Sequence, residues 1–139
     1  MARLEIIADT FLSAGTPAQQ ALPRWFSLQS KIQGEIIERI STNRKALEKK
    51  LGGRNKPRLL HAEGGWAAVL KMPPGRSDEA WALLLLEKDH VACHPGYLFD
   101  FTEGPFLVTS LLPPGNIFEE AWDRITARVD SEIVPIKTF

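Results

Sequence analysis

The sequence predicts a domain of the α+β class, in which a long N-terminal helix leads into a small mixed or antiparallel sheet of about four strands, covered by helices on one face. Two observations carry this prediction. A stripe of apolar residues with helical period runs from Trp25 to Leu51, and after it short β-rich runs alternate with helical segments. The chain of 139 residues is long enough to bury one such core.

Helices are predicted for most of the first part of the chain. Residues 3–12 carry apolar side chains three and four positions apart, which predicts a short helix. Thr16 stands three residues before Gln19, as the N-cap of a capping box does, and Pro17 fits the first helical position. We expect Pro23 to kink or interrupt the helix that follows, because proline lacks the N–H donor.

The long helix is the clearest structural signal in the sequence. It is predicted to end at the glycine pair 52–53, because glycine adopts the left-handed conformation that closes a helix. Its apolar stripe comprises Ile32, Ile36, Ile40, Leu47 and Leu51.

Four short runs then read as strands. The runs at 58–62 and 66–72 are joined by a Glu-Gly-Gly turn, which predicts a hairpin. The runs at 90–94 and 106–112 follow after a helical segment and a loop, respectively. They are expected to complete the small sheet.

Two helices accompany these strands. Ser77 is a suitable N-cap for a helix that extends to about Lys88. Asn116 is predicted to cap the last helix, and the tail at 131–139 has no assignment. The last helix has an apolar stripe that comprises Ile117, Phe118, Ala121, Trp122, Ile125 and Val129. The chain thus divides into a helical segment, residues 1–51, and an α+β domain, residues 52–139.

The composition excludes several classes of protein. Seventeen basic residues balance 17 acidic ones, so the basic stripe of a nucleic-acid-binding protein is absent from the sequence. The longest purely apolar run, "WALLLL", is far shorter than the roughly 20 residues of a membrane span. The single cysteine suits a reducing compartment. We therefore expect a cytoplasmic protein that binds neither nucleic acid nor membranes.

Few residues qualify as catalytic or metal-binding. Cys93 and His94 are neighbours on a predicted strand and so point to opposite faces, which makes Cys93 a small buried residue rather than a nucleophile beside its base. His61 and Glu63 share a strand face, but a solvent-exposed pair is the simpler interpretation without a third partner. No spacing typical of metal ligands or of a phosphate loop occurs. We expect no metal.

The order of several blocks resembles a known family. "LEIIADTFLSAGTPAQQALP", a long helix, "AEGGWAAVLKMP", "VACHPGYLFDF" and "GPFLVTSLLPP" succeed one another over nearly the whole chain. Together they resemble the C-terminal part of class I/II aminotransferases, the fold-type I pyridoxal-phosphate enzymes. The resemblance implies the end of a large domain followed by an α+β small domain, which closes over the cofactor cleft.

The resemblance also implies site residues. The family's Pro-Gly loop lines the substrate entrance, and its serine- and threonine-rich turn often lies near the cofactor phosphate of the neighbouring subunit, so Ser13 and Thr16 are implied cofactor-binding residues across a dimer interface. The implied wall of the substrate cleft comprises Gly64, Gly65, Trp66, Pro95, Gly96, Tyr97 and Phe99.

Two departures from the family limit what this chain can do. Val108 occupies the position of the family's arginine, whose guanidinium pairs with the substrate carboxylate, and valine cannot form that pair. The Schiff-base lysine and most of the cofactor site belong to the half that precedes the resembling segment. We therefore expect no catalytic residue in this chain, and pyridoxal phosphate only in the complete enzyme.

Partners and alternatives follow from this expectation. The resemblance implies an N-terminal cofactor-binding half and a homo-oligomer. Without that half, apolar surface that it would cover is exposed and should favour self-association. This surface comprises Ile6, Ile7, Phe11, Trp25 and Phe26. A second hypothesis is a non-catalytic module that binds a ligand or a protein with the same fold. A third is an unrelated α+β enzyme that uses His61 and Glu63.

Overall fold

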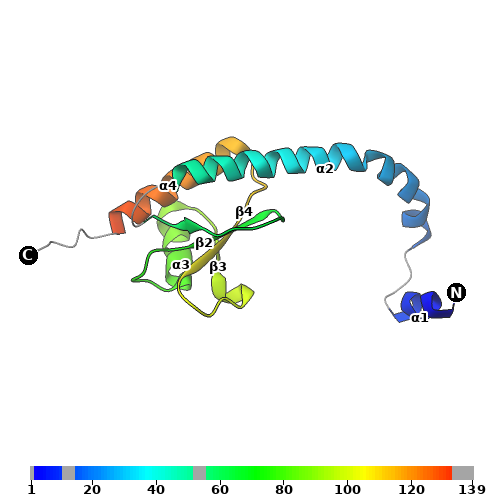
Figure 1. Cartoon of the computed structure of the whole chain (residues 1–139), viewed down its shortest axis with the longest axis horizontal. Helices are drawn as coiled ribbons and strands as arrows, with labels where there is room; N and C mark the ends of the chain where they lie inside the picture. Colours follow the sequence, from blue (N-terminus) through cyan, green and yellow to red (C-terminus); the bar gives the residue numbers. More distant parts are fainter. Residues whose placement is uncertain (1, 11–14, 52–55, 133–139) are drawn as a thin grey trace, which may run out of the picture. The chain divides into compact units, whose positions relative to one another are not determined.

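The computed structural model describes residues 2–10, 15–51 and 56–132 (Figure 1). Two compact units make up the chain, Met1–Glu35 and Ile36–Phe139. The first unit contains helix α1 and the beginning of helix α2, and the second contains the rest of α2, the sheet and the helices α3, η1 and α4. Within the described residues the helices are α1 (Ala2–Thr10), α2 (Thr16–Lys50), α3 (Asp78–Asp89), the 3-10 helix η1 (Gly96–Phe99) and α4 (Gly115–Glu132).

Helix α2 differs from the sequence prediction at its beginning. The carbonyl of Gly15 accepts the first helical hydrogen bond, from the N–H of Gln19 at 3.2 Å. This is the role of an N-cap carbonyl, so the helix begins one residue earlier than a Thr16 cap predicts. Pro23 lies inside the helix and does not interrupt it. One lost hydrogen bond is small beside the many that a helix of 35 residues retains.

Four antiparallel strands form one sheet in the second unit, which confirms the predicted α+β class. They are β1 (Arg58–Leu59), β2 (Ala67–Lys71), β3 (His94–Pro95) and β4 (Phe106–Ser110), and their order is β1-β2-β4-β3. The β1–β2 hairpin is as predicted. The strand predicted for 90–94 is wrong for 90–93, because His90 takes the left-handed conformation that ends α3, with a φ of 56°.

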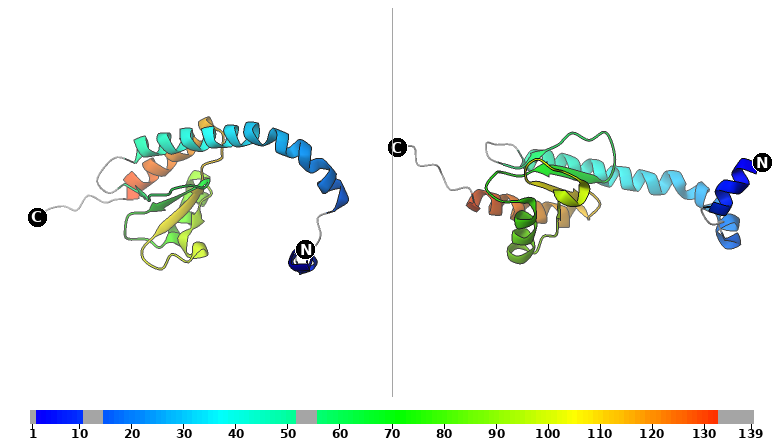
Figure 2. Two further views of the ribbon diagram at one scale, coloured as in Figure 1. Left: turned by 45° about the vertical axis from the view of Figure 1, so that its right-hand side comes forward. Right: turned by 90° about the horizontal axis from the view of Figure 1, so that it is seen from below.

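The core lies between one face of the sheet and the helices. Leu70 of β2 and Leu107 of β4 are opposite each other and point into it. Helix α3 lies behind the sheet in Figure 1, and residues 36–50 of α2 run beside α4 in both views of Figure 2. The helical residues buried in this core are Leu47, Trp81, Ala82, Leu85, Phe118, Trp122, Ile125 and Val129.

The N-terminal caps define where α3 and α4 begin. The hydroxyl of Ser77 accepts a hydrogen bond from the N–H of Ala80 at 3.1 Å, which confirms the predicted N-cap of α3. Helix α4 starts before the predicted cap Asn116, since the carbonyl of Pro114 accepts from the N–H of Phe118. The stripe predicted for α4 is buried as expected except at Ala121, which is partly buried, and at Ile117, which is exposed.

Asn43 is a buried polar residue that the apolar pattern of the sequence does not reveal. Its side chain is 1% exposed, and its amide donates hydrogen bonds of 2.9 Å to the carbonyls of Leu111 and Pro113. These carbonyls belong to the link between β4 and α4. Asn43 therefore joins α2 to the end of the central strand and to the approach to the last helix, and Arg39 of the same helix adds an exposed hydrogen bond of 3.5 Å to the carbonyl of Leu112.

Some predictions fall on residues outside the described part. These are the Gly52–Gly53 stop, Ser13, Phe11 and the tail from residue 133 on. The domain boundary between residues 51 and 52 stays a prediction.

Replacing Asn43 by alanine is expected to lower the free energy of unfolding by about 2–4 kcal/mol, because the carbonyls of Leu111 and Pro113, one buried and one partly buried, lose their donor and a cavity remains. Chemical denaturation followed by circular dichroism measures this. The matched control is Thr42→Ala, at the neighbouring exposed position, which should change stability by no more than about 0.5 kcal/mol. Equal stability of the two variants would contradict the role assigned to Asn43.

Candidate functional site

The turn formed by η1 is held firmly against the sheet. Gly96 packs so closely that a Cβ placed there would lie 2.7 Å from the Cβ of Phe106. The N–H of Tyr97 donates to the carboxylate of Asp78 at 2.8 Å, which ties the turn to the beginning of α3. The turn nonetheless exposes its apolar side chains, Tyr97, Leu98 and Phe99, each at least half exposed. It is a fixed turn with an apolar surface.

The second segment of the predicted cleft wall lies at the other end of β4. Ala67 is opposite Ser110, and the carbonyl of Trp66 accepts from the N–H of Leu111 at 2.7 Å. Gly64 and Gly65 have no neighbours that an added Cβ would meet within 4 Å. In contrast, Pro95 is opposite Leu107, near the start of β4. The structure therefore does not bring the two predicted wall segments together.

One face of the sheet connects these two ends. We call it the open sheet face, because it is the face opposite the helical core. Strand register assigns its members, since residues directly opposite each other share a face and every second residue returns to it. They are Arg58, Ala67, Val69, Lys71, His94, Phe106, Val108 and Ser110.

Val108, which the sequence resemblance places at the family's arginine position, lies in the centre of this face. It is opposite Val69 on one side and His94 on the other. Its side chain is only 5% exposed, and it offers no hydrogen-bonding group. His94 is exposed, and its ring meets that of Phe99 in an edge-on arrangement with centroids 6.1 Å apart. The polar groups of the face are thus at its margins.

Cys93 and His94 point to different sides, as predicted, although Cys93 lies just before β3 and outside the sheet. Cys93 packs against the helical core, while His94 belongs to the open sheet face. Burial raises the pKa of the Cys93 thiol to about 11, although a hydrogen bond with Thr109 lowers it in part. A thiol with such a pKa carries almost no thiolate near neutral pH and is a poor nucleophile.

His61 and Glu63 do not form a dyad on a strand. Both lie in the connection between β1 and β2, beyond the two residues of β1, and both are exposed. The period-two argument that placed them on one face therefore does not apply.

The described residues do not by themselves fit pyridoxal phosphate. A Schiff-base lysine requires an enclosed site with a charge partner, yet no lysine of residues 2–10, 15–51 and 56–132 is buried. Thr16 is exposed at the beginning of α2. No described group of histidine, cysteine and acidic residues could hold a metal ion, and none of the described helices is long and apolar enough to span a membrane.

A shallow cavity of about 260 Å³ lies elsewhere, between α4 and the residues that follow α3. Ile117 and Phe118 line it together with Val91, and Arg124 lies at its rim. The guanidinium of Arg124 is already bound to Glu120 and to the carbonyl of Asp89. This cavity contains none of the residues predicted for the cleft wall.

Solved aminotransferase structures share this fold. A tyrosine aminotransferase from Leishmania infantum is 21% identical with a TM-score of 0.62, over 69% of this chain and 24% of that chain. An aminotransferase from Staphylococcus aureus is 22% identical with a TM-score of 0.64, over 80% and 28%. An α-aminoadipate aminotransferase from Thermus thermophilus, complexed with N-(5′-phosphopyridoxyl)-L-leucine, is 16% identical with a TM-score of 0.68, over 91% and 34%.

The resemblance predicted from the sequence is thus confirmed at the level of the fold. The matches are to fold-type I aminotransferases and are consistent with their small C-terminal domain. This chain spans between 24% and 34% of the length of those three chains. No protein-family model matches the chain, and no curated protein matches it.

The close packing of Gly96 predicts a clear difference between two glycines. Gly96→Ala should lower the free energy of unfolding by about 1–3 kcal/mol, because the new methyl group overlaps Phe106 and displaces η1. Gly64→Ala is the matched control, since open space surrounds that position, and it should leave stability unchanged or slightly raised. Thermal denaturation of both variants tests this, and equal midpoints would refute the packing argument.

Cys93 is expected to react slowly in the native protein. Its pKa of about 11, against 9.0 for the unperturbed thiol, predicts that iodoacetamide at pH 8 alkylates it about a hundredfold more slowly than in the urea-unfolded chain. The same shift predicts that the contribution of Cys93 to the free energy of unfolding is complete below pH 9 and is lost as the pH rises from 9 through 11, because between these values the thiol ionises mainly in the unfolded chain. Equal alkylation rates before and after unfolding would exclude a raised pKa.

Proposed function

We propose that this chain is the C-terminal part of a pyridoxal-phosphate-dependent aminotransferase, which transfers an amino group between an amino acid and a 2-oxo acid. The observation that carries this proposal is the fold likeness to aminotransferases, which extends over 69% to 91% of the chain. The order of sequence blocks supports it independently. In this role the second unit closes over the cofactor cleft.

The chain's own part in the reaction is to bind and enclose rather than to perform the chemistry. Pyridoxal phosphate, when bound in the complete enzyme, supplies the electron sink for amino transfer. The exposed side chains of η1 and the open sheet face are suited to exclude water from a substrate and to orient it. Gly96 supports this role, because its close contact with Phe106 fixes the turn.

The first unit exposes an apolar surface that is suited to bind a partner. Many of its apolar side chains are exposed, including Trp25 at 56% and Phe26 at 64%. An exposed apolar surface of this kind is typical of a protein interface. We assign it to the N-terminal cofactor-binding half, because this chain spans at most 34% of the compared aminotransferases. Association of whole copies into a homo-oligomer, with Ser13 and Thr16 near a neighbouring cofactor, belongs to the same proposal.

The chain alone is expected not to transaminate. Addition of pyridoxal phosphate should produce no visible absorbance band of protein-bound cofactor, and borohydride should not fix the cofactor on one lysine. Absorbance spectroscopy and peptide mass mapping measure both. A stable adduct on a single lysine would overturn the assignment of the cofactor site to another half.

A second arm of the same experiment separates the proposal from its alternative. The large-domain half of the Staphylococcus aureus aminotransferase, ending where its match to this chain begins, is mixed with the chain, and the same half without the chain is the control. Association in sedimentation velocity together with recovered transamination supports the proposal. Failure to associate favours a non-catalytic module that binds a ligand or a protein.

A further inference from the structure

The open sheet face carries positive charge and no negative charge. Its members include Arg58 and Lys71, together with the imidazole of His94 and the hydroxyl of Ser110, and no aspartate or glutamate. The remaining members are alanine, valine and phenylalanine. Since the whole chain has equal numbers of acidic and basic residues, this local imbalance is a property of the face. It favours an anionic ligand.

Arg58 and Lys71 are directly opposite each other across β1 and β2. Like charges at directly opposite positions of an antiparallel pair repel each other and destabilise it. Both residues are exposed, and neither forms an ion pair within the described residues. An anion bound between the two side chains would remove this repulsion.

The exposed Lys71 side chain has two neighbours on this face. Its ammonium lies 5.6 Å from the centre of the Phe106 ring, and its end is near Gly104, where an added Cβ would be 3.4 Å from the Lys71 Cε. Neighbours that restrict the conformations of a lysine reduce the conformational entropy that it loses on binding a ligand. Arg58 adds a planar guanidinium, which matches a carboxylate with two parallel hydrogen bonds.

We infer that Arg58 and Lys71 form the carboxylate-binding site of the open sheet face. The inference deepens the proposed function and rests on it for the choice of ligand, because amino acids and 2-oxo acids both carry a carboxylate. It also accounts for Val108. The positive charge of the face lies on the β1–β2 hairpin instead of on β4, and the partly exposed Val69 beside Lys71 provides apolar contact for the ligand's body.

A titration of the isotope-labelled chain, followed by nuclear magnetic resonance, tests this site. The probe is 3-phenylpropionate, and the amide signals of Arg58, Val69 and Lys71 are expected to shift. The neutral isostere 3-phenylpropanamide should produce no such shifts. Binding of the amide as strong as that of the acid, or the absence of shifts with both, would overturn the inference.

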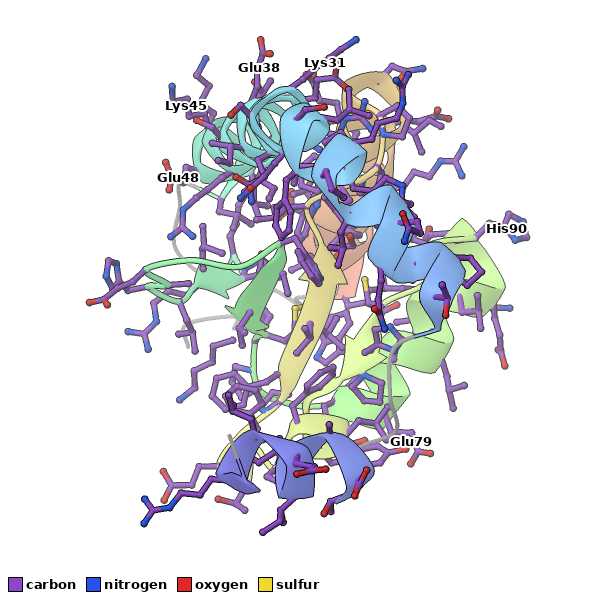
Figure 3. All side chains as sticks on the ribbon, turned by 90° about the vertical axis from the view of Figure 1, so that its right-hand side faces the viewer. Lys31, Glu38, Lys45, Glu48, Glu79 and His90 are labelled. Carbon is purple, nitrogen blue, oxygen red and sulfur yellow. The ribbon has the colours of Figure 1, made fainter. Side chains whose placement is uncertain are left out.

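Matched variants identify the charges responsible. Arg58→Gln and Lys71→Gln should each weaken binding of 3-phenylpropionate about tenfold, as expected for the loss of a charged hydrogen bond. Both should keep the midpoint of thermal unfolding or raise it, since a repulsion is removed. Lys45→Gln is the control, because Lys45 lies on the outer surface of α2, away from the sheet (Figure 3). A control variant that weakens binding equally would show a nonspecific effect and refute the site.

Two further comparisons distinguish a carboxylate site from a phosphate site, and this inference from the proposed function. Inorganic phosphate in place of the acid tests the kind of oxyanion, and tighter binding of phosphate than of 3-phenylpropionate would overturn the carboxylate assignment. The titration uses neither cofactor nor partner. Carboxylate binding without recovered transamination would therefore contradict only the proposed function. Recovered transamination without carboxylate binding at Arg58 and Lys71 would contradict only the inference.

Discussion

The second unit depends on the two hydrogen bonds that the buried amide of Asn43 donates. Leu111 and Pro113 present their carbonyls in the link between β4 and α4, where neither strand nor helix supplies a donor. A buried carbonyl without a donor is costly, so α2 must approach with its amide at this level. That constraint sets the position of α2 along α4 and brings Leu47 into the core one turn later.

Periodicity and capping chemistry are sufficient to predict most of the secondary structure. The α4 stripe from Phe118 to Val129 is buried as its spacing requires, and Ser77 caps α3 because its hydroxyl replaces a missing acceptor. Strand ends are less predictable. The run at 90–94 is rich in apolar residues, but His90 closes α3 in a left-handed conformation, so only its last residue joins the sheet. Tertiary context decides such short runs.

The site is harder to predict because it depends on register. Arg58 and Lys71 are separated in the sequence by a long hairpin connection, and no local pattern states that they are opposite each other. The contact of Gly96 with Phe106 likewise arises from the pairing of β3 with β4. Glycine in a Pro-Gly sequence predicts a turn, but not that the turn packs against a strand. Composition therefore indicates the residue types, and the sheet determines which of them meet.

The absence of an arginine at position 108 does not make the face neutral. Residues directly opposite each other on neighbouring strands share a face, so Arg58 and Lys71 lie on the same side of the sheet as Val108. Val108 can then be buried between Val69 and His94, where an unpaired guanidinium would be costly. The cations are instead at exposed positions, where water solvates them until a ligand arrives. Under the proposed function, this arrangement keeps positive charge on the same side of the sheet and moves the place where the carboxylate of a substrate would bind from β4 to the hairpin.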